Sequence, residues 1–140
     1  MLRASALAVG QVHEQVVVDN LTRTQIVQYA GASGDYNPIH TDEVFATQVA
    51  GYPSVFAHGM LTMGMTGKLL TDLVGDGQLL SYGGRFTSQV WPGDTLVARA
   101  TVTSIDDVDG AVVASFEVAT TNQAGVVVFQ GNATAWVQAG

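Results

Sequence analysis

Cysteine is absent from this sequence, and charged residues are scarce. Without cysteine the chain can form neither disulfides nor thiolate metal sites. Charged side chains make up 12% of the 140 residues, about half of the roughly 25% that is usual in globular proteins. So little charge indicates that another chain covers part of the surface, and we expect a dimer.

Basic segments are missing as well. The chain has 5 Lys and Arg against 12 Asp and Glu, which gives a formal net charge of −7. Without a run of basic residues the protein has no means of following a phosphate backbone. We therefore expect no nucleic-acid partner.

No hydrophobic run is long enough to cross a bilayer. The opening stretch MLRASALAVG falls short of the apolar segment of a signal peptide. The longest apolar region, Met60 to Val74, is interrupted by Lys68 and Asp72 and is shorter than the ~20 residues that a spanning helix needs. We expect a soluble, cytoplasmic protein with no membrane span, and residues 1–140 fit one domain.

The first half of the chain combines one strand with short helices. Residues 12–19 alternate loosely around three central valines and predict a strand. Thr22 or Thr24 can then cap a short helix that Gly31 and Gly34 end.

Two further helices follow. One is expected from Thr41 to about Val49, closed by Gly51. The other is expected from His58 to Val74, where apolar side chains occupy most of the helical wheel. A helix that is apolar nearly all round is typical of a buried position.

The second half is rich in Val, Thr, Ala and aromatic residues and is divided by turn sequences. The separators WPGD, DDVDG and NQAG all favour turns. The expected strands are residues 78–90, 95–105, 111–121 and 126–137, and we predict that they form an antiparallel meander. With the earlier strand and the buried helix, this pattern predicts an α+β fold whose curved antiparallel sheet wraps around a long central helix.

The segment SGDYNPIH, residues 33–40, carries two titratable groups five positions apart. Pro38 lacks an amide hydrogen and pushes Asn37 toward extended conformations, so this segment cannot be a helical turn. On a bent loop Asp35 and His40 can converge on one water, remove its proton and supply a proton elsewhere. Spacing alone leaves another interpretation open, in which Asp35 caps nearby backbone and His40 caps the following helix.

The segment AHGMLTMG, residues 57–64, opens the long helix with His58 and Gly59. The free amides and the dipole of a first helical turn favour negative charge. Charge developing on a carbonyl oxygen at the Gly59 N–H would therefore be stabilised, and such donors are typically worth ~3 kcal/mol. Close packing of the helix on a sheet is the other explanation for a glycine here.

Three segments together resemble one known family. They are YAGASGDYNPIHTDEVFA, FAHGMLTMG and VWPGDTL, residues 29–46, 56–64 and 90–96. They are similar to the MaoC-like family of (R)-specific enoyl-thioester hydratases and (3R)-hydroxyacyl-thioester dehydratases. The resemblance covers nearly the whole chain and implies a single hot-dog domain over residues 1–140.

The resemblance also implies roles for individual residues. Asp35 and His40 would be the catalytic pair that holds the water added to, or lost from, C3 of the acyl chain. The Gly59 amide would form the oxyanion hole for the thioester oxygen, and Asn37 would support the loop. Which member of the pair is the base stays open, because coupled groups share their protons.

The implied activity is that of a hydro-lyase in fatty-acid or related acyl-chain metabolism. The substrate would be an acyl thioester carried by coenzyme A or by an acyl carrier protein, with no cofactor. We expect a homodimer or a heterodimer with a related hot-dog subunit, and an acyl carrier protein as a possible further partner.

Two other functions fit the same residues. A hot-dog thioesterase would use a carboxylate to direct water at the carbonyl carbon in place of C3. A noncatalytic subunit would only shape a neighbour's acyl tunnel, although this chain keeps both Asp35 and His40.

The remaining histidines indicate no metal site. A zinc site needs three or four ligands, and His13, His40 and His58 have unrelated spacings in a chain without cysteine. We expect His13 to face solvent and His58 to act as a helix cap or a packed side chain.

Overall fold

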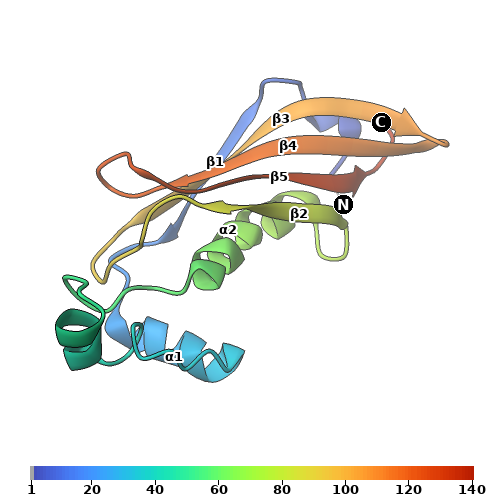
Figure 1. Cartoon of the computed structure of the whole chain (residues 1–140). Helices are drawn as coiled ribbons and strands as arrows, with labels where there is room; N and C mark the ends of the chain where they lie inside the picture. Colours follow the sequence, from blue (N-terminus) through green and yellow to red (C-terminus); the bar gives the residue numbers. More distant parts are fainter. Residues whose placement is uncertain (1) are drawn as a thin grey trace.

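The computed structural model describes residues 2–140 and contains one β-sheet covered by helices on one face (Figure 1). The elements in chain order are η1 (Ala4–Ala6), β1 (Val12–Val18), α1 (Arg23–Ser33), η2 (Phe45–Val49), α2 (Gly59–Val74), β2 (Leu79–Phe86), β3 (Leu96–Val108), β4 (Ala111–Thr121) and β5 (Val127–Val137).

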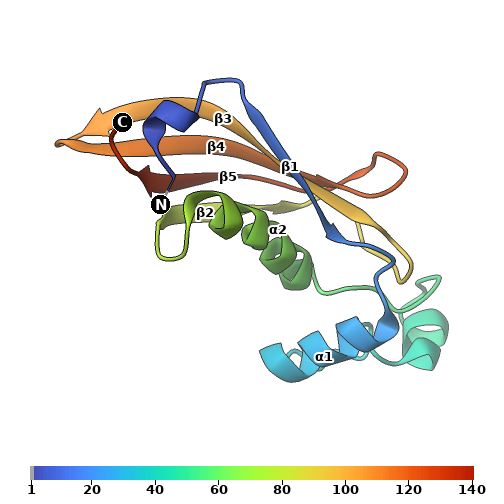
Figure 2. The ribbon, with the colours of Figure 1, turned by 180° about the vertical axis from the view of Figure 1, so that it is seen from behind.

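The sheet has five antiparallel strands in the order β1-β3-β4-β5-β2. Helix α2 lies against one face of this sheet, and α1 lies on the far side of α2 (Figures 1 and 2). Arg3 forms a bridge with Gln138, so the two ends of the described chain meet at one end of the sheet. The predicted hot-dog architecture, a curved sheet around a central helix, is confirmed.

The strand order corrects one sequence-based expectation. Only β3, β4 and β5 form a meander, because β2 pairs with β5 and does not touch β3. Strand β1 already occupies the free edge of β3, so the strand that follows α2 takes the other edge of the sheet. β2 also ends at Phe86, short of the expected Val90, and residues 87–95 cross back to β3.

Helix α2 packs on the sheet through one stripe of side chains. Thr62, Thr66, Leu69, Leu70 and Val74 are its buried residues, and their spacing of three to four places them on one face. The sector predicted to hold Lys68, Thr71 and Asp72 is present in part, since Lys68 and Asp72 are exposed, but burial over the rest of the helix is less complete than predicted. The opposite face is uncovered, and Met60 there is 56% exposed.

Helix α1 has strong local end signals. Thr22 is its N-cap, and Thr22 and Gln25 form a capping box. Gly34 ends the helix with a φ of 75°, a left-handed conformation that glycine adopts without strain. Gly31, which was expected to end the helix, lies inside it.

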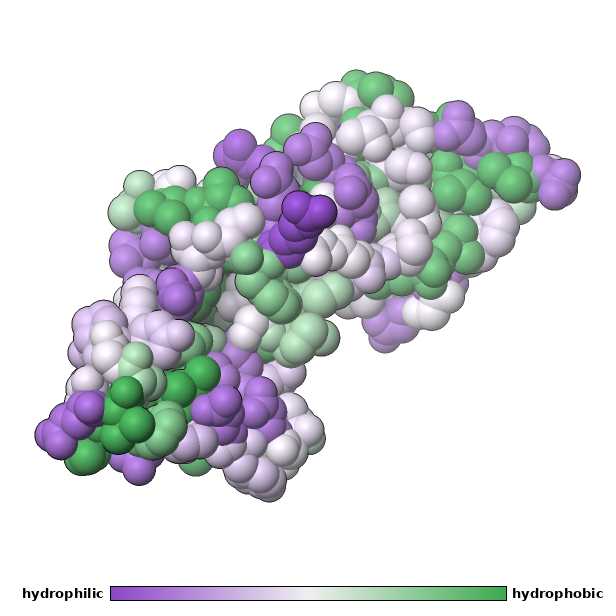
Figure 3. Space-filling view, viewed as in Figure 1, coloured by the Kyte–Doolittle hydropathy of each residue, from purple (hydrophilic) through white to green (hydrophobic). Residues whose placement is uncertain are grey.

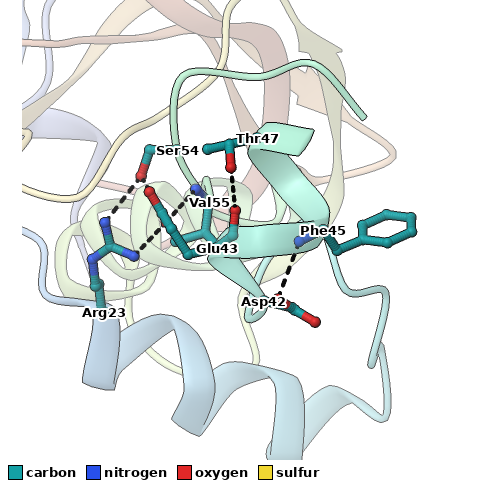
Figure 4. Close-up of polar contacts among 7 residues, drawn as sticks. All are labelled: Arg23, Asp42, Glu43, Phe45, Thr47, Ser54 and Val55. Carbon is teal, nitrogen blue, oxygen red and sulfur yellow. Dashed lines mark hydrogen bonds and ion pairs between the residues drawn. The ribbon is translucent and has the colours of Figure 1, made fainter. Parts of the chain in front are cut away.

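A polar network joins three segments that lie apart in the sequence (Figure 4). Arg23 at the start of α1 donates to the carboxylate of Glu43 at 2.7 Å and to the hydroxyl of Ser54 at 3.2 Å. The same Glu43 carboxylate accepts the backbone N–H of Val55 at 3.2 Å. The network therefore connects α1 and the residues before η2 to the segment that leads into α2.

Across residues 2–140, none of the helices combines the length and the apolar character that crossing a membrane requires.

A threonine pair in the core gives a first prediction. The hydroxyls of Thr66 and Thr120 are buried and lie 2.6 Å apart. Thr66→Val leaves the Thr120 hydroxyl without a partner, and we expect it to lower the free energy of unfolding by about 1–3 kcal/mol. Thr66→Val with Thr120→Val removes both polar groups and should recover most of that loss. Urea denaturation measures both, and a double variant as unstable as the single one would contradict the prediction.

The Glu43 network gives a second prediction. The hydrogen bond from Arg23, followed by the Val55 N–H, lowers the pKa of Glu43. Because the pKa of Glu43 in the folded state lies below the unfolded value of 4.5, ionised Glu43 stabilises the fold at pH values above 4.5. This stabilisation is lost as the pH falls through the folded-state pKa. Glu43→Gln should therefore lower the melting temperature at neutral pH, and the difference should shrink below pH 4.5.

Asp72→Asn is the matched control, because the Lys68–Asp72 pair is similarly exposed and lies within one helix, and the carboxylate has one long contact outside it, 3.4 Å from the Gln15 side chain. We expect a smaller change for this variant, and both effects should weaken in high salt, which screens exposed charges. Equal melting temperatures of Glu43→Gln and the parent protein at neutral pH would show that the network does not stabilise the fold.

Candidate functional site

The loop after α1 is a polar turn held by its own side chains. The Asp35 carboxylate accepts the Asn37 N–H at 3.2 Å, and the Asn37 side-chain oxygen accepts the Ile39 N–H at 3.1 Å. The backbone role considered for Asp35 is therefore present. The His40 cap of that alternative interpretation is absent, because Asp42 accepts the Phe45 N–H at the start of the next helix (Figure 4).

His40 is buried at the end of this turn, with 7% of its surface exposed. Its Nδ1 lies 2.6 Å from the backbone oxygen of Phe56. A carbonyl oxygen only accepts, so Nδ1 carries a hydrogen and Nε2 is the basic nitrogen of the neutral ring. Burial is the main cause that lowers the pKa of His40 below its ordinary value of 6.5. The Phe56 carbonyl and Asp35 oppose this shift, and His58 adds to it.

His58 lies beside His40 and is 2% exposed. It is the N-cap residue of α2, although its side chain makes no capping hydrogen bond. Its Nε2 is 3.0 Å from the backbone oxygen of Asp35, and its ring stacks on His40 with centroids 3.8 Å apart. His58 is therefore packed at a helix start, as expected, but it also lies within the Asp35–His40 cluster, which that expectation did not include.

The structure brings Asp35, His40 and His58 together. One ligand atom from each residue, a carboxylate oxygen or a ring nitrogen, lies within 4.8 Å of the other two. Asp35 is exposed, whereas both histidines are buried. The side chains thus form a site that is open to solvent on the aspartate side and closed behind the imidazoles.

These three residues are also the group most able to hold a metal. The hydrogen bonds of His40 Nδ1 and His58 Nε2 to carbonyl oxygens leave the second nitrogen of each ring free, as in metal-bound histidines. One feature opposes a metal. The two rings are stacked with an interplanar angle of 26°. The lone pair of an imidazole nitrogen lies in the plane of its ring, so the lone pairs of stacked rings lie in nearly parallel planes. A metal needs ligands whose lone pairs point at one atom. The geometry suits proton transfer better, and the absence of a metal stays a prediction.

Gly59 begins α2 next to this cluster. No acceptor within residues 2–140 pairs with its N–H. A Cβ placed on Gly59 would lie 2.7 Å from the ring of Phe86, so only glycine lets this ring approach the first turn. Close packing, the second explanation for this glycine, is therefore present, and the Gly59 N–H is still free to donate a hydrogen bond.

A cavity of about 310 Å³ opens beside Gly59. Its lining includes Phe56, Thr62 and Phe86, together with residues 87–90. Asp35 and His40 are not among its lining residues, but the Phe56 ring contacts His40 edge-on with centroids 5.1 Å apart. The acid–imidazole cluster and the cavity are thus neighbours on either side of Phe56.

Several of these contacts were not evident from the sequence. The Phe56 carbonyl and the Phe86 ring carry no local signal, because each depends on a segment far away in the chain. His58 was noted beside Gly59, but its contact with Asp35 depends on tertiary structure. His13 was expected to face solvent, which is wrong: it is half-buried, and its Nε2 has no partner within residues 2–140.

Comparison with known proteins assigns the chain to a family. The family described as "MaoC like domain" matches residues 5–124. The (R)-specific enoyl-CoA hydratase of Rhodospirillum rubrum is 36% identical over 121 residues, which are 85% of this chain and 81% of that protein. The 3-hydroxyacyl-thioester dehydratase Y of Mycobacterium tuberculosis is 40% identical over 87 residues, 60% of this chain and 30% of that protein.

A solved structure has the same architecture along nearly its whole length. The structure described as the (R)-hydratase from A. caviae involved in PHA biosynthesis superimposes with a TM-score of 0.84 at 27% identity, covering 96% of this chain and 99% of that one. The chain spans only 22–30% of the length of three of the curated relatives that it matches. On the match over residues 5–124 and the shared fold, the chain belongs to the MaoC-like domain family.

Proposed function

We propose that the chain reversibly hydrates a trans-2-enoyl thioester to the (R)-3-hydroxyacyl thioester, as an (R)-specific hydratase or dehydratase. The observation that supports this best is the convergence of the Asp35 carboxylate and the His40 ring beside the first turn of α2. Hydratase and dehydratase relatives over most of the chain support the same activity.

In the proposed reaction Asp35 and His40 hold one water molecule. As the water oxygen bonds to C3, one of the pair takes a water proton and the other delivers a proton to C2. Dehydration is the reverse, in which the C3–O bond breaks and the C2 proton is removed. The pair can exchange these roles with direction, and Asn37 holds the turn through its bond to Ile39.

Gly59 is the proposed oxyanion donor. Negative charge develops on the thioester oxygen when C2 has carbanion character, and the Gly59 N–H at the start of α2 would receive it. The adjacent cavity of about 310 Å³ offers space for part of the thioester. No cofactor is required for any of these steps.

The carrier can be coenzyme A or an acyl carrier protein, and both present phosphate. Three of the five basic residues, Arg23, Lys68 and Arg99, are paired with carboxylates of this chain. Within residues 2–140 that leaves Arg3 and Arg85 without an ion pair. So few available cations do not distinguish the two carriers, and binding of an acidic carrier protein would need positive charge from a partner chain.

We further propose a homodimer, or a heterodimer with a related hot-dog subunit. Edge strand β2 carries Leu80 and Phe86, which are 45% and 48% exposed, and an exposed apolar edge is a site for strand pairing. Hydrophobic surface also shows on the lobe formed by α1 and η2 (Figure 3), where Val44 and Val49 are exposed. One chain of the structure described as the ChsH1-ChsH2 complex from Mycobacterium tuberculosis shares this fold, with a TM-score of 0.79 at 22% identity.

Within the family we propose a role like that of the B subunit of the mycobacterial (3R)-hydroxyacyl-carrier-protein dehydratase, which the chain resembles in its NPIH and AHGMLTMG segments. A single domain over residues 1–140 and a cytoplasmic location belong to the same proposal. A thioesterase remains the alternative enzyme, because the exposed Asp35 could direct water at the carbonyl carbon. A noncatalytic partner role is disfavoured by the presence of both Asp35 and His40.

Conservative variants test the proposed pair. Asp35→Asn keeps an oxygen for the Asn37 N–H, and His40→Asn keeps an N–H near the position of Nδ1 for the Phe56 carbonyl. Each removes one proton-transfer group, so we expect turnover to fall by ~100-fold or more with a nearly unchanged melting curve. The measurement is the loss of enoyl absorbance with short and long trans-2-enoyl-CoA substrates and the chain purified alone.

Asp76→Asn, a change in the exposed turn after α2, is the control and should keep full activity. A thiol reagent in the same assay separates the two enzyme functions, because hydrolysis releases free coenzyme A and hydration does not. Normal turnover of Asp35→Asn and His40→Asn would remove the pair from the mechanism. If the chain is active only with a partner, Asp35→Asn in that complex decides, because unchanged turnover there would favour the noncatalytic role.

The pH dependence of kcat/KM tests the state of His40. Because burial lowers the pKa of His40, its transition should lie below pH 6.5 in the free enzyme. Activity that falls as the pH drops through this transition would identify neutral His40 as the active form, and activity that rises would identify the imidazolium. A His40-dependent transition above pH 6.5 would contradict the predicted shift.

A further inference from the structure

His58 is a buried imidazole that contacts three separate parts of the site. It belongs to the N-cap of α2 and touches Asp35 of the polar turn, the ring of His40, and Tyr29 of α1, whose ring meets it edge-on with centroids 4.8 Å apart. No step of the proposed reaction uses it. Its position raises the question of why a polar ring is buried there.

Only one of the two ring nitrogens of His58 has a hydrogen-bond partner within residues 2–140. Nε2 lies 3.0 Å from the Asp35 carbonyl oxygen, so it carries the hydrogen and donates. Nδ1 is buried and has no partner within residues 2–140. An unpaired buried polar atom is unfavourable, and a phenyl ring of similar shape would avoid that penalty. The histidine must therefore supply something that an apolar ring cannot.

The bond to the Asp35 carbonyl supplies a tether. Asp35 is exposed and belongs to a turn whose other bonds are local, with Ser33 and Asn37 as its partners. Within residues 2–140, the His58 contact is the hydrogen bond that connects Asp35 to α2. This hydrogen bond limits the distance between the Asp35 carboxylate and the His40 ring.

The ring face of His58 supplies a support for the second group. His40 is fixed in its plane by the bond from Nδ1 to the Phe56 carbonyl, but one hydrogen bond still lets a ring tilt about its axis. Phe56 meets this ring edge-on at 5.1 Å, and His58 lies against its face at 3.8 Å. His58 thus limits the direction in which Nε2 of His40 points.

We propose that His58 is a positioning residue that fixes the separation and mutual orientation of Asp35 and His40, by its Nε2–H on the Asp35 carbonyl and by its ring face on His40. This inference rests on the proposed function. Catalytic groups must stand within hydrogen-bond reach of the atoms they serve, and a misplacement of about 1 Å can reduce the rate ~100-fold. A side chain that touches no reacting atom can therefore have a large effect on kcat.

His58 also contributes to the protonation of His40. The groups that face His40 are Asp35 from its own turn, His58 from α2 and the carbonyl of Phe56. Asp35 and the carbonyl raise the pKa of His40, whereas His58 lowers it in addition to the main effect of burial. Removing the His58 imidazole should therefore move the His40 transition to higher pH.

Three variants separate the two contacts. His58→Phe keeps a ring against His40 and Tyr29 but loses the hydrogen bond to the Asp35 carbonyl. His58→Gln keeps an N–H near the position of Nε2 but loses the ring that lies against His40. His58→Ala loses both contacts. We expect kcat to fall ~10-fold in each of the first two and ~100-fold in His58→Ala, with KM within ~3-fold of the parent value. His58→Phe should melt close to the parent protein, because removal of the unpaired Nδ1 offsets the lost bond to the Asp35 carbonyl.

The readouts are kcat and KM with trans-2-enoyl-CoA, the pH profile of kcat/KM, and an NMR titration of His40. A lower kcat with an upward shift of the His40 transition supports the proposal. Unchanged kcat and an unmoved transition in His58→Phe and His58→Ala overturn it. Rates that fall only in proportion to the folded fraction also overturn it, because they indicate a purely structural role.

The NMR titration separates this inference from the proposed function. If the parent protein shows no enoyl turnover, the proposed reaction has failed, and the titration alone decides whether His58 influences His40. A moved His40 transition would then support the contact and its effect, and an unmoved one would exclude them.

Discussion

The packing of α2 on the inner face of the sheet is the contact on which the site depends. Leu69, Leu70 and Val74 near the end of the helix are buried against strand residues such as Phe116 and Phe129. Full burial of such side chains stabilises a fold by about 1.5–3 kcal/mol each. This packing fixes the axis of the helix, and the axis in turn fixes where its first turn, with His58 and Gly59, meets the other segments.

Two different kinds of interaction then bring the rest of the site to that first turn. A second apolar cluster, which includes Leu21 just before α1 and Ile26 in its first half, holds the start of this helix against the core. The Glu43 network joins the opposite end of the same region to Ser54 and Val55. Asp35, on the exposed turn, and His40, buried behind it, are therefore carried by segments that are anchored on both sides.

Some buried polar groups in and near the site have hydrogen-bond partners, and others have none. His40 and Thr66 have close partners, whereas His58 Nδ1 and the hydroxyl of Thr62 are buried without one in the described chain. Unpaired buried atoms oppose stability, and these two lie beside the acid–imidazole cluster and the cavity. Two of the three buried side-chain polar atoms without a partner in residues 2–140 thus lie where the proposed reaction takes place, and the third, Nε2 of His13, lies in β1.

The sequence by itself determined the local elements and the composition of the site. Thr22 with Gln25, Gly34 and Pro38 set helix ends and a turn through effects within a few residues, and the strand turns were equally readable. The motif residues Asp35, His40 and Gly59 were identified by spacing and by family resemblance. Their meeting at one place was an expectation, and their catalytic roles remain a proposal.

Only the tertiary structure decided which edge of the sheet β2 joins, which face of α2 is left open, and which groups surround His40. Strand order depends on which edges are already occupied, and the burial of a helix depends on what is packed against it, so neither is encoded in a local pattern. The partners of His40 come from Phe56 and His58, 16 and 18 positions further along the chain. Contacts at that separation form only once the core has fixed the helix and the turn in space, which is why the sequence named the groups and the fold arranged them.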